Sequence, residues 1–595
     1  MFQLHPPKPT KTTTARAPTP FLALTRAFFE QFFTSESVTS DVRLRQALIG
    51  ALAFLLAPGM FLMIELFPEF SFIAIRVRLS RLPMSRLDDL LAWTAFLLTT
   101  YSMAATGLVT VMAWNSLTFD RRDAMVLGPL PLKPRTILGA KFCALGLFLL
   151  TASLPINVVN ATMFASVTAD QFGGARMASH FIALLVATVG GGVLSFALIV
   201  MLRATVALVG GPHLAAACGP PLQFLCIVGL LSLFIFCPFV LDIPFLSAGF
   251  TNALPSAWFV GVFERLRHSP RAFDPRFPIA MLTQRALVVT SVALAGAVTL
   301  SIVEFGRHLR FTIAPPASPG VLGNATAART IARLMAGRNR AARAIADFIL
   351  LTLARNRAHR APIAINAAIG TAIIIAALSQ HTSDFASVMR PRTAVLWVPL
   401  VVGYWTTVGM RASFFIPSEL ASSWAFRVNA ADPATPVWAA VRAAMIAFIL
   451  PRTLLVTVLL VPLIGWYMVM WHAVVVAAVV VLFIELVALT IDHVPFTQPY
   501  RPGHAKLKTR WSVYLAGVYV FAYVPARLEL RLGASAPLFA TVAGVIAVIA
   551  ALEIAGHWRS SSGATEPGDE IDESDLSEVT VLDLGGAIYG GTGRQ

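Results

Sequence analysis

The sequence predicts an all-α, polytopic membrane protein with about twelve transmembrane helices. Of its 595 residues, 57% are hydrophobic and 13% are charged, whereas soluble domains are close to half apolar and a quarter charged. The mean hydropathy is +0.74. The apolar residues also occur in long runs, each close to the ~20 residues that an α-helix needs to cross a bilayer.

The first half of the chain spans residues 20–303, after a Pro-, Thr- and Lys-rich segment, 1–19, that we expect to be disordered. Residues 20–35 place aromatic side chains at helical spacing, which predicts a helix lying in the membrane interface. Apolar runs of bilayer length then predict six spans, at residues 46–66, 91–113, 142–160, 180–202, 222–241 and 280–303.

A basic linker, residues 304–340, leads to the second half, 341–556, which opens with another interfacial segment around Phe348. The same length criterion predicts a second set of spans, at residues 362–379, 393–413, 440–463, 473–491, 511–526 and 535–556. The tail, 557–595, is rich in acidic residues, and we expect it to be disordered.

The charges predict an orientation. An even number of spans places both termini on one side, and most of the 46 Lys and Arg residues then lie on the cytoplasmic side, as the positive-inside rule requires. The formal net charge of +16 fits cytoplasmic loops that face anionic lipid. Richness in alanine and arginine is associated with GC-rich bacterial genomes, so we expect a bacterial inner-membrane protein. Arginines on the predicted outer loops are exceptions, at positions 76, 78, 81, 86, 265, 267, 271 and 276.

A charged stretch separates the second and third predicted spans. Asp120, Arg121, Arg122 and Asp123 begin about two helical turns that end after Leu127, where Gly and Pro follow. Charges do not stay in hydrocarbon, so this stretch lies outside the membrane, where a soluble partner can push on it. The alternative is a solvated connector whose charges only set the topology.

The second half contains a counterpart after its second span, in which we single out Glu419, Trp424 and Arg427. Together with the interfacial segments, this correspondence predicts two six-helix repeats. The predicted outer loop 242–279 carries Pro255, Trp258 and Glu264, which predict a short helix at the level of the lipid headgroups.

These features resemble the ABC-2 type exporter permeases. The resemblance is carried by the run from Phe119 through Asp123 to Leu127, by Leu130-Pro131 and Lys141, and by the Leu-Pro-x-x-Trp-Phe sequence at 254–259. It implies an export permease whose cytoplasmic ATP-binding subunit, a separate protein, docks on the charged stretches. The chain departs from the family by carrying about twelve spans where the family usually has about six. One chain can therefore supply both halves, or two copies can pair as a homodimer.

Several kinds of chemistry have no motif in the chain. No Gly-x-x-x-x-Gly-Lys-[Ser/Thr] sequence occurs, so a driving ATP would bind a partner subunit. No hydrolase or metalloprotease motif and no basic-aromatic nucleic-acid module is present, so we expect no enzymatic activity, cofactor or nucleic-acid partner. The four cysteines match no zinc spacing.

Arg452 and Glu485 lie in the middle of two successive predicted spans. If the turn between the spans is centred near Trp466–Trp471, an antiparallel hairpin places both side chains at one depth. A lone charge there costs at least ~2.5–3.5 kcal/mol on insertion scales, so we expect an ion pair. That pair is either a gate or substrate contact, or a packing contact between the two helices.

Two other functions compete with the permease. A secondary transporter of the major facilitator kind also has two six-helix halves, but its Gly-x-x-x-Asp-Arg-x-Gly-Arg-Arg loop is incomplete at Asp120-Arg121-Arg122. A lipid-linked sugar transferase needs an acidic or histidine cluster outside the membrane. The outer loop offers only a diffuse set, at Asp242, Glu264, His268 and Asp274.

Overall fold

In the computed structural model the chain is helical, and no strand occurs in the part of the chain that the structure describes. The described residues are 19–32, 59–60, 63–64, 66–114, 116–117, 127, 130–172, 174–240, 253–274, 277–311, 326–379, 393–416, 437–491, 493–497, 513–514 and 516–561. They form two compact units, Met1–Ser318 and Pro319–Gln595, and the boundary falls inside the predicted linker.

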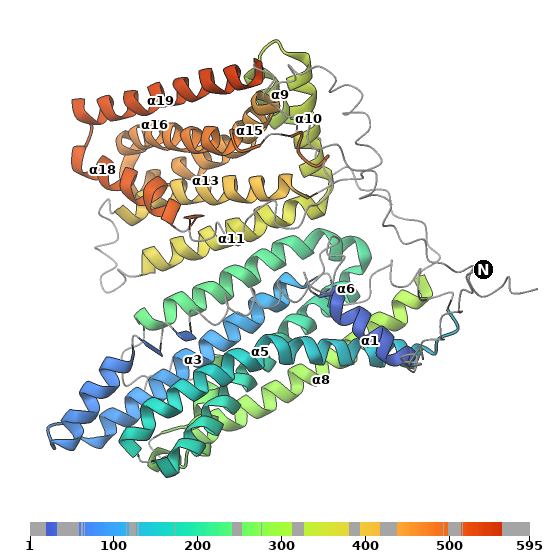
Figure 1. Cartoon of the computed structure of the whole chain (residues 1–595), viewed down its shortest axis with the longest axis vertical. Helices are drawn as coiled ribbons and strands as arrows, with labels where there is room; N and C mark the ends of the chain where they lie inside the picture. Colours follow the sequence, from blue (N-terminus) through green and yellow to red (C-terminus); the bar gives the residue numbers. More distant parts are fainter. Residues whose placement is uncertain are drawn as a thin grey trace, which may run out of the picture. The chain divides into compact units, whose positions relative to one another are not determined.

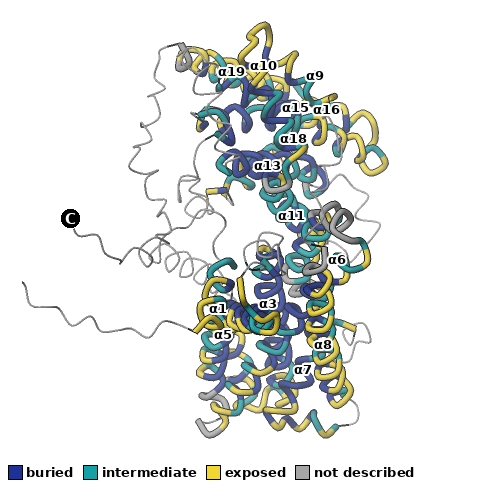
Figure 2. Tube along the Cα trace, turned by 90° about the vertical axis from the view of Figure 1, so that its right-hand side faces the viewer, coloured by how far each residue is buried: buried dark blue, intermediate teal, exposed yellow. Residues whose placement is uncertain are grey.

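Unit 1 is built around helix α3 (Met84–Met112), which contacts three other helices (Figure 1). The most apolar window of α3 is 83% buried, whereas that of α8 is 17% buried, and Figure 2 shows the same contrast. Unit 1 also contains α1 (Pro20–Gln31), α5 (Pro134–Phe172), α6 (Gly174–Val240), α7 (Pro255–Leu266), η3 (Pro270–Phe273) and α8 (Ile279–Phe311).

Close helix packing in the core of unit 1 depends on glycine. A Cβ on Gly192 of α6 would lie 2.8 Å from Ser153 Oγ of α5 and 2.9 Å from Thr106 Oγ1 of α3. A Cβ on Gly191 would lie 2.9 Å from a methyl carbon of Thr99. Small residues that let helix backbones approach are typical of helix interfaces in membranes.

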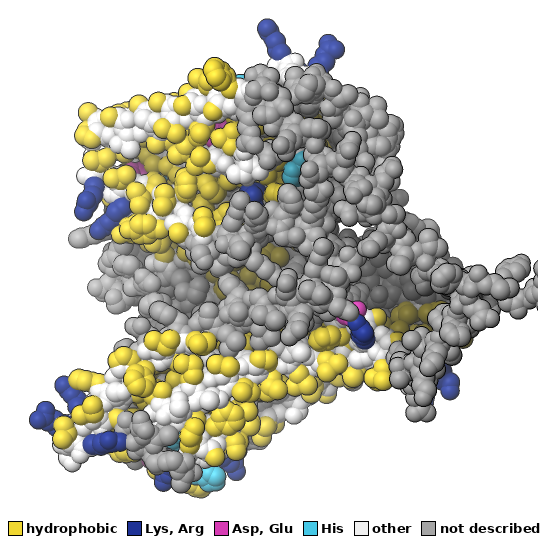
Figure 3. Space-filling view, in the orientation of Figure 1, with side chains coloured by type: hydrophobic (Ala, Val, Ile, Leu, Met, Phe, Trp, Pro, Cys, Tyr) yellow, Lys and Arg dark blue, Asp and Glu magenta, His cyan; other side chains and the backbone are white. Residues whose placement is uncertain are grey.

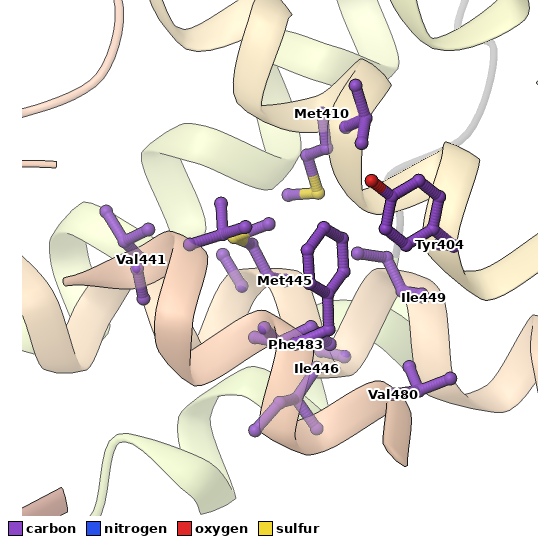
Figure 4. Packing of buried hydrophobic residues seen from close by; sticks show 14 of the residues in the cluster. Tyr404, Met410, Val441, Met445, Ile446, Ile449, Val480 and Phe483 are labelled. Carbon is purple, nitrogen blue, oxygen red and sulfur yellow. The ribbon is translucent and has the colours of Figure 1, made fainter. Parts of the chain in front are cut away.

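Unit 2 packs around α13 (Thr393–Phe414), α15 (Val437–Val458) and α16 (Val461–Ala488). Figure 4 shows its core, in which the rings of Tyr404 and Phe483 stack with centroids 4.5 Å apart. The remaining helices of this unit are α9 (Thr326–Met335), α10 (Arg340–Arg355), α11 (Arg357–Ser379), η5 (Tyr519–Tyr523), α18 (Val524–Leu532) and α19 (Ala536–Ser561).

Seven helices among the described residues are long and apolar enough to cross a membrane, or eight if α10 and α11, bent by 77°, form one span. The seven lie within α3, α5, α6, α8, α15, α16 and α19. Apolar side chains cover much of the described surface that is visible in Figure 3, and several Lys and Arg side chains lie at its edges. The protein is therefore a helical, membrane-embedded protein, while the twelve-span count and the two repeats stay predictions.

Several predicted boundaries differ from the structure. The predicted spans 180–202 and 222–241 both fall in the helical stretch α6, apart from residue 241. Within α6, Arg176–Gly210 is long and apolar enough to cross a membrane, and Pro221–Leu233 forms a separate, shorter apolar helix. The predicted span 511–526 overlaps a π-helical turn that leads into α18, a short helix with three charged residues. Most of the predicted span 46–66 lies outside the described residues.

Candidate functional site

Of the first charged stretch, the structure describes only the end. Asp120, Arg121, Arg122 and Asp123 lie outside the described residues, whereas Leu127 is helical and half-buried. Leu127 packs against an apolar cluster formed by α1, α5 and α8, whose buried members are Phe28, Ile137, Ala140, Ala144 and Phe305. The end of the charged stretch is thus attached to α1 and to the next long helix, α5.

Lys141 of α5 is buried against α1, with 2% of its surface exposed. Its Nζ donates a hydrogen bond to Gln31 Oε1 at 3.3 Å and lies 4.7 Å from the ring centroid of Phe28 and 5.4 Å from that of Phe32. A buried ammonium group needs such compensation, and aromatic faces supply part of it. Because Phe28, Gln31 and Phe32 share one helix face, α1 docks on α5 through this lysine.

Unit 2 contains a similar arrangement around α10. Its buried face carries Ile345, Ile349 and Leu353 at a spacing of four residues, and α10 contacts α15, the helix that follows the second charged stretch. The N-cap residue Asn339 accepts a hydrogen bond from the Ala342 backbone N–H at 3.1 Å. Glu419, Trp424 and Arg427 of that stretch lie outside the described residues.

Helix α9 is fastened to α10 by charge. Asp347 of α10 lies 3.2 Å from Arg329 Nε and 2.6 Å from Arg333 Nη2 of α9. Burial alone would raise the pKa of Asp347, but hydrogen bonds and charge from the two arginines outweigh it and lower the pKa below its ordinary value. The same contacts raise the pKa of Arg333.

The start of the second charged stretch is held by an aromatic cluster around Phe496. The Phe496 backbone N–H donates to the Phe414 carbonyl oxygen at 3.1 Å, and its ring meets the His359 ring edge-on at 4.5 Å. Phe348 of α10 completes the cluster at 6.1 Å. Phe496 has a φ of 70°, an uncommon conformation for a bulky residue that these contacts maintain. Phe496 therefore joins the middle of α10, the start of α11 and the end of α13 to the segment that follows α16.

The predicted outer helix is α7. Pro255 occupies its first position and Trp258 is half-buried. Glu264 is fully buried and accepts hydrogen bonds from Arg267, at 2.8 Å from Nη2 to Oε2. Arg267 Nη2 also lies 2.9 Å from Asp88 Oδ1, on α3. Burial alone would lower the pKa of Arg267, but the charges of Glu264 and Asp88 and their hydrogen bonds raise it above its ordinary value.

A second arginine extends this contact to η3. Arg271 Nη2 lies 2.6 Å from Asp89 Oδ1 and donates to the Ser85 carbonyl oxygen at 2.8 Å. The Ser269 hydroxyl accepts from the Arg271 backbone N–H and so caps the short helix. We call the set Asp88, Asp89, Glu264, Arg267 and Arg271 the outer clasp. It fastens α7 and η3 to the first turns of α3.

The expected pairing of Arg452 with Glu485 is wrong. Glu485 is fully buried and accepts a hydrogen bond from Arg442 Nε, and Arg442 Nη1 also lies 3.3 Å from Glu553 Oε1 on α19. Arg452 instead donates to the Phe448 carbonyl oxygen, and its guanidinium lies 3.8 Å from the centroid of the Phe448 ring. The ion pair therefore links α15 to α16 and α19 through a different arginine.

The position of the turn explains this error. The chain leaves α15 at Leu459–Leu460 and has a non-helical residue at Gly465, so the turn lies before Trp466 and is not centred near Trp466–Trp471. Arg452 therefore lies close to the turn, whereas Glu485 lies near the far end of α16. A helix break at Gly465, with a φ of 78°, separates the first turn of α16 from the rest of the helix.

Polar side chains also line the interface between α3, α5 and α6. Asn157 Nδ2 donates to Ser102 Oγ at 2.9 Å, and Ser102 Oγ donates to the Thr188 carbonyl oxygen at 2.8 Å. Asn157 Oδ1 and both side-chain polar atoms of Asn160 have no hydrogen-bond partner in the described part of the chain. Polar groups inside a membrane bundle are costly and often mark a substrate path.

The sequence contains weak signals for the residues that were missed. Asp88-Asp89 is a pair of acids at the edge of a span, and the arginines at 267 and 271 are exceptions to the positive-inside rule. Asn157 and Asn160 interrupt an apolar run at helical spacing. No such signal identifies which acid meets which arginine.

No group of three or more His, Cys, Asp or Glu side chains able to hold a metal ion occurs among the described residues.

Comparisons with known proteins add no assignment. No family model, no curated protein and no solved structure matches the chain.

Proposed function

We propose that the chain is the membrane permease of an ABC-type exporter, driven by a separate cytoplasmic ATPase that docks on the two charged stretches. One observation carries the proposal. In each unit an amphipathic helix packs on the long helix that directly follows a charged stretch, α1 on α5 and α10 on α15. The chain itself acts as a transport subunit in the bacterial inner membrane and binds no ATP.

The contacts of the first stretch give a route for the motion. Leu127 shares its apolar cluster with Phe28 of α1 and Ile137 of α5. A displacement of the stretch therefore moves α1 and α5 together, because close-packed side chains transmit strain. Helix α5 contacts α3 and α6, and the polar interface around Asn157 lies between these three helices. We place the substrate path there.

The first experiment tests for the motor. The full chain is purified from its native host in mild detergent, and ATP hydrolysis and the co-purifying proteins are measured. We expect an ATP-hydrolysing protein in the complex and its loss from the Arg121→Glu, Arg122→Glu double variant. Arg81→Glu is the matched control, because Arg81 is exposed and lies on a predicted outer loop. A wild-type complex without an ATPase would overturn the proposal.

A second experiment tests the mechanical link. Leu127→Glu places a carboxylate against the apolar cluster, which costs about 1–3 kcal/mol or detaches the stretch. Leu130→Glu is the control, because Leu130 is 47% exposed in the same segment. We expect the ATPase to remain bound to Leu130→Glu and to be reduced in the Leu127→Glu complex. Equal binding to both variants would contradict the proposed role of Leu127.

A further inference from the structure

Unit 2 contains a buried acid–base pair that the proposed function does not use. His472 of α16 and Glu529 of α18 are 0% and 1% exposed, and His472 Nδ1 lies 2.7 Å from Glu529 Oε2. Neither residue contributes to the charged stretches or to the outer clasp. Ionisable side chains inside membrane bundles are rare and mark ion pathways and proton relays.

Each member of the pair has a second polar atom without a partner. His472 Nε2 and Glu529 Oε1 are buried and have no hydrogen-bond partner among the residues that the structure describes. The surroundings are apolar, since Trp471 packs edge-on against Phe539 of α19 at 4.7 Å and Val469 and Val475 are buried on α16. A pair that served packing alone would gain from satisfying these atoms.

The other charged groups on the neighbouring helices are exposed or in contact with other residues. Arg527 and Arg531 of α18 are exposed. Glu485 and Glu553 bind Arg442. Arg452 on α15 contacts Phe448, and Arg411 on α13 contacts Thr490 and Tyr514. His557 on α19 contacts Trp438.

Burial in an apolar site favours zero net charge on the pair. A neutral imidazole beside a carboxylate leaves one negative charge in a poorly solvated site, and an imidazolium beside a carboxylic acid leaves one positive charge. Zero net charge requires one added proton, either on the imidazole beside a carboxylate or on the carboxyl beside a neutral imidazole. The buried pair therefore holds one dissociable proton, which can leave only when water reaches Nε2 or Oε1.

The local backbone provides a way to open the site. Helix α18 is nine residues long, follows the π-helical turn Tyr519–Tyr523 and ends at Gly533, with a φ of 57°. Single π-helical turns occur often at functional sites. On α16, exposed Trp466 and Tyr467 are typical of the membrane interface, and His472 lies about 8 Å deeper along the helix. A small movement of α18 can hydrate the pair from that interface.

We propose that His472 and Glu529 form a binding site for a single proton, occupied while α18 packs on α16 and opened to water when α18 moves. Uptake breaks an O–H bond of a hydronium ion, leaves a water molecule and forms an N–H or O–H bond on the pair. Release breaks this new bond and returns the proton to water. The site does not depend on the proposed ATPase. It gives the protein a proton-linked conformational step whichever energy source drives transport.

The test is infrared difference spectroscopy on the full chain in lipid nanodiscs, recorded between two pH values and repeated in D2O. We expect a protonation signal that shifts in D2O and is lost in Glu529→Gln and in His472→Gln. Glu529→Asp keeps a carboxyl group, so its band should shift in frequency and remain. His180→Gln is the control, because His180 is buried but contacts the Thr168 hydroxyl.

The outcomes separate clearly. A signal that survives in both Gln variants places the proton elsewhere and overturns the proposal, as does a wild-type spectrum without any deuterium-sensitive change. If the Gln variants unfold, the Glu529→Asp band decides, since an unshifted band does not come from Glu529. No ATPase takes part in this measurement, so its result is independent of the proposed function.

Discussion

Removing the arginine at the centre of the outer clasp should destabilise unit 1 strongly. In Arg267→Met the fully buried Glu264 carboxylate loses its hydrogen-bonded cation, and Asp88 loses its partner at 2.9 Å. Breaking a buried ion pair by removing one partner costs about 3–5 kcal/mol, because the other charge stays buried. At about 1.4 kcal/mol per tenfold change, the unfolding equilibrium constant rises roughly 100- to 3,000-fold.

The assay is equilibrium unfolding of the purified protein in mixed micelles. Arg265→Met is the matched control, because Arg265 is exposed and lies two residues away in the sequence, and it should change stability by less than about 0.5 kcal/mol. Adding Glu264→Gln to Arg267→Met removes the uncompensated charge and should recover at least about 1 kcal/mol. The reasoning is refuted if Arg267→Met and Arg265→Met unfold alike, or if the second substitution adds a further full loss.

Two other variants test charges in unit 2. Arg442→Met should destabilise the protein by about 3–5 kcal/mol, because it leaves the buried Glu485 carboxylate uncompensated. Arg452→Met should cost far less. Equal losses of stability in mixed-micelle unfolding would contradict the observed pairing. The lowered pKa of Asp347 stabilises the folded state above the ordinary pKa of 3.8, and this stabilisation is lost as pH falls through the lower folded-state value. Asp347→Asn should flatten the acid limb of the stability curve, and an unchanged limb would show that its contacts with Arg333 do not stabilise the folded state.

Length and apolar composition predicted the helical membrane architecture correctly, because they depend on local sequence. The predicted span 91–113 lies almost wholly within α3, and 280–303 lies within α8. The helix expected at 20–35 is present as α1, Pro20–Gln31, and the 3.6-residue period reveals its aromatic face, while its place in the membrane interface stays a prediction.

The partners of charged residues could not be read from local pattern. Arg267 and Asp88 are 179 positions apart, and their contact depends on how α7 packs against α3. The error at Arg452 has the same origin, because one misplaced turn changes which residues of an antiparallel hairpin share a depth. The pairing of His472 with Glu529, 57 positions apart, likewise needs the fold of α18 over α16.

The buried contacts of unit 1 also bear on why the proposed permease would need an outside source of energy. The outer clasp fastens α7 and η3 to α3, and Lys141 fastens α1 to α5. Any state in which these helices separate must hydrate or re-pair the buried charges. A charge that stays buried without its partner costs several kcal/mol. A bound partner shifts such an equilibrium only by its differential affinity for the two states. A partner that displaces Leu127 moves α1 and α5, and so acts first on the contact that Lys141 makes between them. The outer clasp meanwhile keeps α7 and η3 attached to the first turns of α3. If the proposed ATPase exists, Arg267→Met should therefore loosen the α7 end without altering its capture, which would show that the outer clasp and the first charged stretch act independently.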